Sequence, residues 1–172
     1  LLLAGTPHLC RIVVRSPRLG ASRPEAAINR LHIRKEVFHL SKKLRLGIIG
    51  CGGIANGHVT RSDATGHAEI VALMEPNDDT FAAFLARHES LAKAKRYATH
   101  TEMLAEAKLD GVIICSPHCF HHDQIMDSLA AGVNVLCEKP MCSTVDDPLE
   151  VVQKAEETGL VCMTAYQRHF MS

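Results

Sequence analysis

The chain of 172 residues has no long apolar run, no net charge and no repeated or low-complexity segment. No apolar stretch approaches the ~18 residues that suggest a membrane span, so we expect no membrane association. Lysine plus arginine number 19 and aspartate plus glutamate also 19. Residues 44–172 are mildly acidic, which leaves no basic stripe there for binding nucleic acid. The length is enough for one ordinary domain and a tail.

Residues 1–43 differ from the rest and lack an initiator methionine. They are rich in arginine and poor in acidic residues, a composition typical of a mitochondrial transit peptide. However, Pro7, Pro17 and Pro24 interrupt any helix with one basic face. We therefore expect residues 1–43 to be a basic, disordered extension, or upstream sequence read in the same frame. A cytoplasmic location is the expectation, with a mitochondrial one as the alternative.

Seven cysteines, an odd number, are spread along the chain. Four of them lie in or beside apolar, strand-like runs: Cys51, Cys115, Cys137 and Cys162. Buried and reduced thiols in a cytosolic protein explain this placement better than disulfides do.

From residue 44 onward, apolar runs rich in β-forming residues alternate with helical stretches. The runs fall at 45–50, 69–74, 111–115, 133–137 and 160–164, with a weaker one at 95–98. Several are apolar at nearly every position, as strands covered on both faces of a parallel sheet require. The sequence therefore predicts an α/β, doubly wound Rossmann fold over residues 44–172, with strand order 3-2-1-4-5-6.

Capping residues mark the starts of the helices between these runs. Asn77 and the two aspartates after it offer N-caps for a helix that we expect to extend to His88. Thr99 and Glu102 have the spacing of a capping box. Gly132 and Gly159 follow later helical stretches and predict their ends.

A glycine-rich turn follows the first run, with the pattern G-x-G-x-x-A. Gly50 suits the tight turn, Gly52 removes the Cβ that would block a pyrophosphate, and Ala55 lets a helix pack close to its strand. The helix N-terminus offers unpaired N–H groups to phosphates. The sequence therefore predicts that this turn binds a dinucleotide.

Glu75 ends the next apolar run, 25 residues after Gly50. Its carboxylate can accept hydrogen bonds from both ribose hydroxyls of NAD and would repel a 2′-phosphate. Pro76 and Asn77 offer no arginine to offset that repulsion, so we expect NAD rather than NADP. The alternative is a carboxylate near a helix start that binds no ligand.

The stretch Cys137-Glu138-Lys139-Pro140 stands at the end of the fifth predicted strand, 133–137, when the weaker run at 95–98 is counted. Ligands of open α/β sheets bind at the carboxyl ends of strands, where this stretch falls. A lysine there can reach a nicotinamide and a substrate hydroxyl. Pro140 would aim the lysine by fixing the backbone, through a peptide bond that is either cis or trans. An exposed loop lysine beside a turn proline is the alternative.

Histidines and cysteines gather within residues 115–122 and invite a zinc site: Cys115, His118, Cys119, His121 and His122. No second Cys/His pair stands at finger spacing, so we predict no metal and place His122 toward solvent. His58, on the helix after the glycine turn, either contacts a neighbouring loop or is simply a packed or capped side chain. We favour the second interpretation.

Four motifs stand in the order and spacing of one family: Gly50–Ala55, Glu75–Asn77, Ser116–His121 and Glu138–Pro140. The chain resembles the N-terminal domain of Gfo/Idh/MocA-type oxidoreductases, the group of glucose–fructose oxidoreductase and inositol dehydrogenase. The resemblance assigns Lys139 a place near nicotinamide and substrate, as the catalytic residue. It also implies that Ser116 and Pro117 touch the cofactor, with His121 as the histidine of that motif. The cofactor-binding residues that we predict are Gly50, Cys51, Gly52, Gly53, Ile54, Ala55, Glu75, Ser116, Pro117, His121, Glu138 and Lys139.

Members of that family continue into a second α/β domain that contributes substrate contacts and commonly pairs in dimers. This chain ends at Ser172, soon after residues 166–170, which resemble the segment leading toward the substrate side. We therefore expect a fragment or truncated gene product that lacks the second domain. It would bind NAD, have a sugar- or polyol-like substrate in a full-length parent, and be inactive alone. The alternative is a non-catalytic NAD sensor or interaction module.

Overall fold

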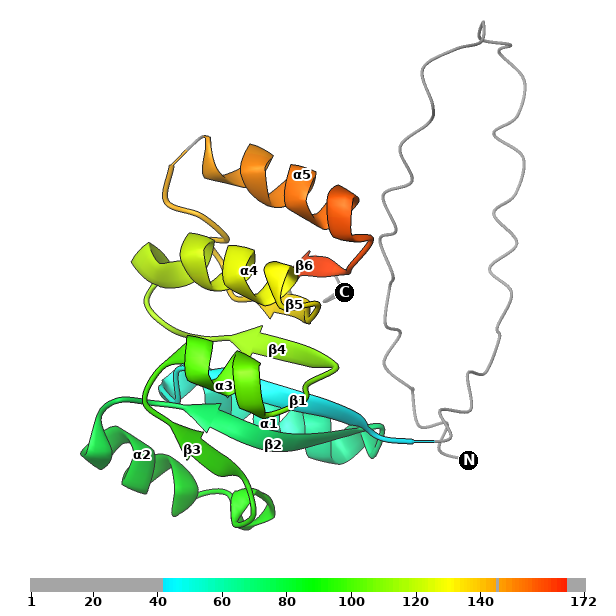
Figure 1. Cartoon of the computed structure of the whole chain (residues 1–172). Helices are drawn as coiled ribbons and strands as arrows, with labels where there is room; N and C mark the ends of the chain where they lie inside the picture. The colour runs from blue at the N-terminus through cyan, green and yellow to red at the C-terminus, as the bar shows by residue number, and fades with distance from the viewer. Residues whose placement is uncertain (1–41, 145, 167–172) are drawn as a thin grey trace, which may run out of the picture. The chain divides into compact units, whose positions relative to one another are not determined.

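The computed structural model describes residues 42–144 and 146–166, which form an open parallel sheet flanked by helices (Figure 1). The sheet has six strands in the order β3-β2-β1-β4-β5-β6. This confirms the predicted doubly wound fold and its strand order. The predictions for residues 1–41 and for residues 167–170 concern parts of the chain outside this description.

The three central strands of the sheet end at the same level, and the candidate site lies at their carboxyl ends. In β1 (Leu44–Ile49), the last residue pairs with Met74 of β2 (Ala68–Met74) and with Ile114 of β4 (Gly111–Ile114). The next residues along the three strands therefore lie side by side. The remaining strands are β3 (Lys95–Tyr97), β5 (Asn134–Cys137) and β6 (Cys162–Thr164).

Helices cover both faces of the sheet, with α3 in front and α1 behind it in Figure 1. One apolar cluster joins the sheet to α3 (His100–Glu106), α4 (His121–Ala130) and α5 (Asp147–Thr158). A second joins the other face to α1 (Gly53–Thr65) and α2 (Asp78–Leu85). All four residues of β4 are buried, as the unbroken apolar run predicts. None of the helices in the described ranges is long and apolar enough to cross a membrane.

The predicted helix caps are confirmed, whereas the predicted length of α2 is wrong. The Asn77 side chain accepts a hydrogen bond from the Thr80 N–H at 2.8 Å, and Thr99 accepts one from the Glu102 N–H at 3.2 Å. Helix α2 ends at Leu85, and a short 3-10 turn, η1 (Glu89–Leu91), begins after His88. The His88 ring instead lies 2.7 Å from the Asn56 side chain of α1, a tertiary contact that competes with continued helix.

Candidate functional site

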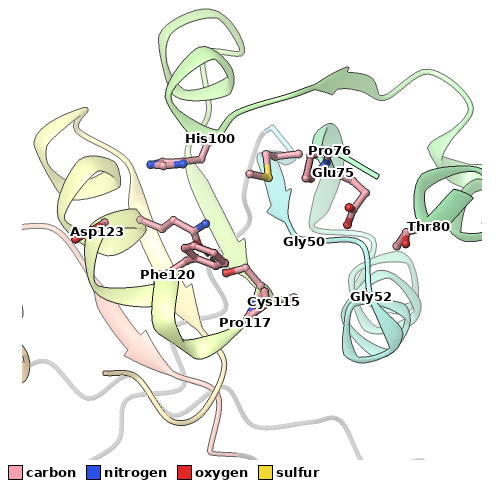
Figure 2. Close-up of a pocket in the computed structure, with 13 residues that line it drawn as sticks. Gly50, Gly52, Glu75, Pro76, Thr80, His100, Cys115, Pro117, Phe120 and Asp123 are labelled. Carbon is pink, nitrogen blue, oxygen red and sulfur yellow. Dashed lines mark hydrogen bonds between the residues drawn. The ribbon is translucent and has the colours of Figure 1, made fainter. Parts of the chain in front are cut away.

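A cavity of about 710 Å³ opens at the carboxyl ends of β1, β2 and β4 (Figure 2). It lies where the strand order reverses between β1 and β4, the position at which open α/β sheets bind ligands. Its walls come from the loops after these strands and from the starts of the following helices. They are formed by Gly50, Gly52, Met74, Glu75, Pro76, Thr80, His100, Cys115, Ser116, Pro117, Phe120, Asp123 and Gln124.

The two glycines of the turn are needed for different reasons. Gly50 has φ +88°, and a Cβ there would lie 2.7 Å from the backbone nitrogen of Ser116. Both the left-handed backbone and the close approach of the β4 loop therefore require glycine at this position. A Cβ on Gly52 would meet no atom within 4 Å, so this glycine faces open space at the cavity.

Helix α1 begins directly after Gly52, and no side chain caps its N-terminus. Its first backbone N–H groups and the positive end of its dipole are thus left for an anion. Cys51 and Ala55 are buried, whereas Ile54 is 49% exposed at the start of the helix. The geometry of the turn is that of a phosphate cradle.

Glu75 is 8% exposed and holds the glycine turn in place. Its Oε2 accepts a hydrogen bond from the Cys51 N–H at 3.0 Å, and its Oε1 accepts one from the Asn77 N–H at 3.0 Å. Each carboxylate oxygen has a second lone pair, so the group can still accept hydrogen bonds from a ligand. In Figure 2 the carboxylate lies between the glycine turn and Thr80.

Arg96, on β3, is a neighbour of Glu75 that sequence reasoning missed. Its Nε donates to the Glu75 carbonyl oxygen at 2.9 Å, and Nη1 lies 2.6 Å from Asp78 Oδ1. The guanidinium also stacks 4.5 Å from the ring centre of Phe81. No local pattern signals this placement, because the sheet brings Arg96 to a residue 21 positions earlier.

The opposite wall of the cavity comes from the loop after β4. The Ser116 hydroxyl donates to Gln124 Oε1 at 2.6 Å and so orients the side-chain amide of Gln124, a buried residue. Phe120, at the end of the 3-10 turn η2 (His118–Phe120), is 54% exposed and faces the cavity beside Pro117 (Figure 2). Sequence reasoning identified Ser116 and Pro117 here but not Phe120 or Gln124. The start of α4 directly after the Ser116–Pro117 turn was the sequence signal that could have indicated these two residues.

Lys139 lies on the exposed loop after β5 and does not line the cavity. Glu138 is buried, at 6% exposure, and its Oε2 accepts a hydrogen bond from the Lys139 N–H at 3.3 Å. The Lys139–Pro140 peptide bond is cis, one of the two options that the sequence left open.

Two buried histidines contact the loop around Lys139. His58 Nε2 lies 2.8 Å from Glu138 Oε1, so the expectation of a merely packed or capped histidine is wrong and the contact with a neighbouring loop holds. His121 is 1% exposed, with Nδ1 2.8 Å from the Pro140 carbonyl oxygen and Nε2 2.9 Å from that of Ser116. This burial favours a supporting role for the His121 side chain over direct contact with a ligand.

One other residue of the histidine–cysteine group departs from its prediction. His122, expected to face solvent, is only 25% exposed and lies 3.2 Å from Glu150 Oε2 of α5. The change follows from α5 packing on α4, which the sequence pattern did not place. Within the described ranges no group of three or more metal-binding side chains converges.

All six cysteines in the described part of the chain are free thiols, and Cys51, Cys115 and Cys137 are buried. Burial raises the pKa of Cys51 and of Cys115 from 9.0 to about 12, with the charges of Glu75 and Glu138 adding to it respectively. Burial also raises the pKa of Cys137. These thiols stay protonated near neutral pH, which suits core packing and not nucleophilic chemistry.

Comparison with known proteins assigns the Rossmann fold of this chain to one family. Residues 44–166 match the Gfo/Idh/MocA family, described as an oxidoreductase family with an NAD-binding Rossmann fold. Inositol 2-dehydrogenase of Corynebacterium glutamicum is 31% identical over 115 residues, which are 66% of this chain and 33% of that protein. D-xylose 1-dehydrogenase (NADP(+)) of Hypocrea jecorina is 33% identical over 138 residues, covering 74% and 35% of the two chains.

A solved structure agrees. Scyllo-inositol dehydrogenase of Lactobacillus casei, with bound NAD(H) and scyllo-inositol, superposes with a TM-score of 0.69 at 25% identity, covering 76% of this chain and 38% of that one. The chain thus spans about a third of the length of the curated relatives it matches. With the family match covering most of the chain, and with the glycine turn, Glu75 and the sheet in the expected places, this protein belongs to the Gfo/Idh/MocA oxidoreductase family.

Proposed function

We propose that this chain is the NAD-binding part of an oxidoreductase that transfers a hydride between a sugar- or polyol-like hydroxyl and a nicotinamide. The observation that carries the proposal is the open space at Gly52, directly before the uncapped N-terminus of α1 and beside Glu75. A diphosphate would fit that space, because no Cβ fills it and the first N–H groups of the adjoining helix have no side-chain cap. When bound, NAD supplies the nicotinamide C4 that accepts or gives the hydride.

Different residues around the cavity would bind different parts of the dinucleotide. Residues 50–55 would cradle the diphosphate, and Glu75 would accept hydrogen bonds from the adenosine ribose hydroxyls. Ser116 and Pro117 line the wall formed by the loop after β4. The nicotinamide would then lie toward the ends of β4 and β5, where Lys139 stands.

The preference for NAD over NADP rests on charge. A 2′-phosphate at the adenosine ribose would meet the buried Glu75 carboxylate, whereas Arg96, the nearby cation, is already paired with Asp78 and stacked on Phe81. The relative named for NADP shows that the choice differs within the family. Titration with NADH and NADPH tests the preference, and equal affinities would contradict it.

Lys139 is the residue that we propose for proton transfer or substrate orientation. Its ammonium is on an exposed loop at the carboxyl end of β5, and an amine there can hold or pass the proton of a substrate hydroxyl. In a longer parent protein, Lys139→Met should abolish turnover and leave NAD binding largely unchanged. Normal turnover in that variant would contradict the role.

We further propose that the 172-residue chain alone binds the dinucleotide without turnover. The matched part of the chain covers only about a third of each curated relative. The substrate would be held by the rest of such a protein, which would also provide contacts for dimers. The test follows NADH absorbance with a panel of polyols, with and without a separately supplied C-terminal domain. Oxidation of a polyol by the chain alone would contradict this proposal.

A second candidate function is an NAD-binding module that performs no chemistry. The exposed position of Lys139, outside the walls of the cavity, favours it. The same assay separates the two: saturable NADH binding with no absorbance change in any combination supports the module, and an absorbance change with an added domain supports the oxidoreductase.

A further inference from the structure

The loop that carries Lys139 is held on both sides by buried histidines from two different helices. Lys139 itself is exposed, and its long side chain has many rotamers. A residue that serves a bound nicotinamide needs a backbone fixed relative to the dinucleotide. The contacts around Glu138 and Pro140 supply that restraint.

On the N-terminal side, the Glu138 carboxylate joins α1 to the loop. Oε1 accepts a hydrogen bond from His58 Nε2 at 2.8 Å, and Oε2 accepts one from the backbone N–H of Lys139 at 3.3 Å. His58 and Glu138 are each 6% exposed. A carboxylate that is so buried depends on such partners, so the pair fixes the start of the loop.

His58 lies on the same helix whose N-terminus faces the cavity. Helix α1 starts at Gly53, just over one turn before His58, and the loop contact spans 80 residues of sequence. A short, rigid helical segment therefore connects the predicted diphosphate cradle to the residue before Lys139. A shift of the loop relative to the cradle would break a buried hydrogen bond.

On the C-terminal side, the His121 ring joins the loop to the wall of the cavity. Its Nδ1 is 2.8 Å from the Pro140 carbonyl oxygen, and its Nε2 is 2.9 Å from the Ser116 carbonyl oxygen. Carbonyl oxygens only accept hydrogen bonds, so the His121 ring is the donor in each hydrogen bond that it makes to them. The residue after Lys139 is thus tied to a residue that lines the cavity.

We propose that His58 and His121 are positioning residues, which hold the backbone on either side of Lys139 so that its amine meets the nicotinamide end of a bound dinucleotide. The inference rests on the proposed function, since it takes Lys139 as the residue beside the nicotinamide. It adds two side chains that would act through Glu138 and Pro140 and touch neither cofactor nor substrate.

The test follows the Lys139 amine by NMR in the full chain after reductive ¹³C-methylation of its lysines. The Lys139 signal is assigned by its loss in Lys139→Arg. NADH and ADP-ribose, which lacks the nicotinamide, are the two probes. We expect the wild-type signal to move on adding NADH and to stay in place with ADP-ribose, because only NADH brings the ring to the amine.

Two variants at one position separate positioning from folding. His58→Gln keeps an N–H donor for Glu138 and should retain the NADH-induced shift, whereas His58→Leu should reduce it about threefold or more, in line with the loss of a hydrogen bond to a charged group. His67→Leu, at an exposed histidine, is the matched control and should change nothing. ADP-ribose affinity should stay within about twofold of wild type in all three variants, because the cradle is untouched.

The outcomes are distinct. An undiminished shift in His58→Leu would overturn the inference and leave the proposed function standing. If His58→Leu also loses affinity for ADP-ribose, His58 has a general structural role, and this result would overturn the inference. In that case Glu138→Gln, which preserves side-chain size, must lose affinity for ADP-ribose as well. Absence of binding of either probe to the wild-type chain would overturn the proposed function and this inference with it.

Discussion

The Oε2 of Glu75 accepts a hydrogen bond from the backbone N–H of Cys51 at 3.0 Å, so the acid at the end of β2 holds the glycine turn at the end of β1. Its second oxygen accepts the Asn77 N–H, which fixes the approach to α2. The Glu75 carboxylate therefore holds the turn that would bind a diphosphate, and it can also accept hydrogen bonds from the adjacent ribose. Any substitution of Glu75 is expected to affect both the turn and the ribose contact.

Glu75→Gln is expected to lower the free energy of unfolding by about 1–3 kcal/mol, because the amide NH₂ then faces one of the two backbone N–H groups and leaves it unpaired. It should also narrow the difference in affinity between NADH and NADPH, since the negative charge is gone. Urea denaturation and titration with both nucleotides measure the two effects. Glu69→Gln, on the exposed side of β2, is the control and should stay within about 0.5 kcal/mol of wild type. Unchanged stability of Glu75→Gln would contradict the structural role.

Gly50→Ala should lose stability, whereas Gly52→Ala should stay stable and lose affinity for NADH. The first places a Cβ 2.7 Å from the Ser116 nitrogen at φ +88°, and should cost about 2–5 kcal/mol of stability. The second meets no protein atom within 4 Å, so stability should change by less than about 1 kcal/mol. NADH affinity of Gly52→Ala should nevertheless fall at least about tenfold, because the methyl group enters the space of the diphosphate. Thermal melts and NADH fluorescence titrations separate the pair, and unaltered NADH binding by a folded Gly52→Ala would refute the cradle.

The buried thiols predict a loss of stability at alkaline pH. The pKa of Cys51 and of Cys115 is raised in the folded state from 9.0 to about 12. Between these values the folded chain binds more protons than the unfolded chain, so the free energy of unfolding falls as pH rises above about 9 and is unaffected by these groups below it. Urea midpoints at pH 7, 9 and 10.5 measure the trend. A double variant, Cys51→Ala and Cys115→Ala, should show a shallower fall; an equal fall would assign the effect to other groups.

Much of the fold follows from patterns that are local in sequence. Apolar runs with no polar interruption predict buried strands, and six β/α units that begin with the glycine turn predict the strand order of a doubly wound sheet. The caps at Asn77 and Thr99 were predictable for the same reason, since their partners lie three residues away. The end of α2 was not, because His88 contacts Asn56 of another helix.

The contacts that shape the site are long-range, which explains why the sequence does not show them. His58 and Glu138 are 80 residues apart, and neither position has a local pattern that points to the other. Arg96 reaches Glu75 across the sheet through a backbone carbonyl, which any residue could provide. His121 was found through its motif, yet its buried place between two carbonyl oxygens needed the packing of α4 on the loops.

Binding of NADH to the full chain tests the central claim most directly. Calorimetric or fluorescence titration should show saturable binding of one NADH per chain, competition by ADP-ribose, and an affinity for NADPH at least about tenfold weaker because its 2′-phosphate meets Glu75. The same titration with Gly52→Ala should show little binding while the variant remains folded. A folded wild-type chain that binds neither NADH nor ADP-ribose at millimolar concentration would contradict the account.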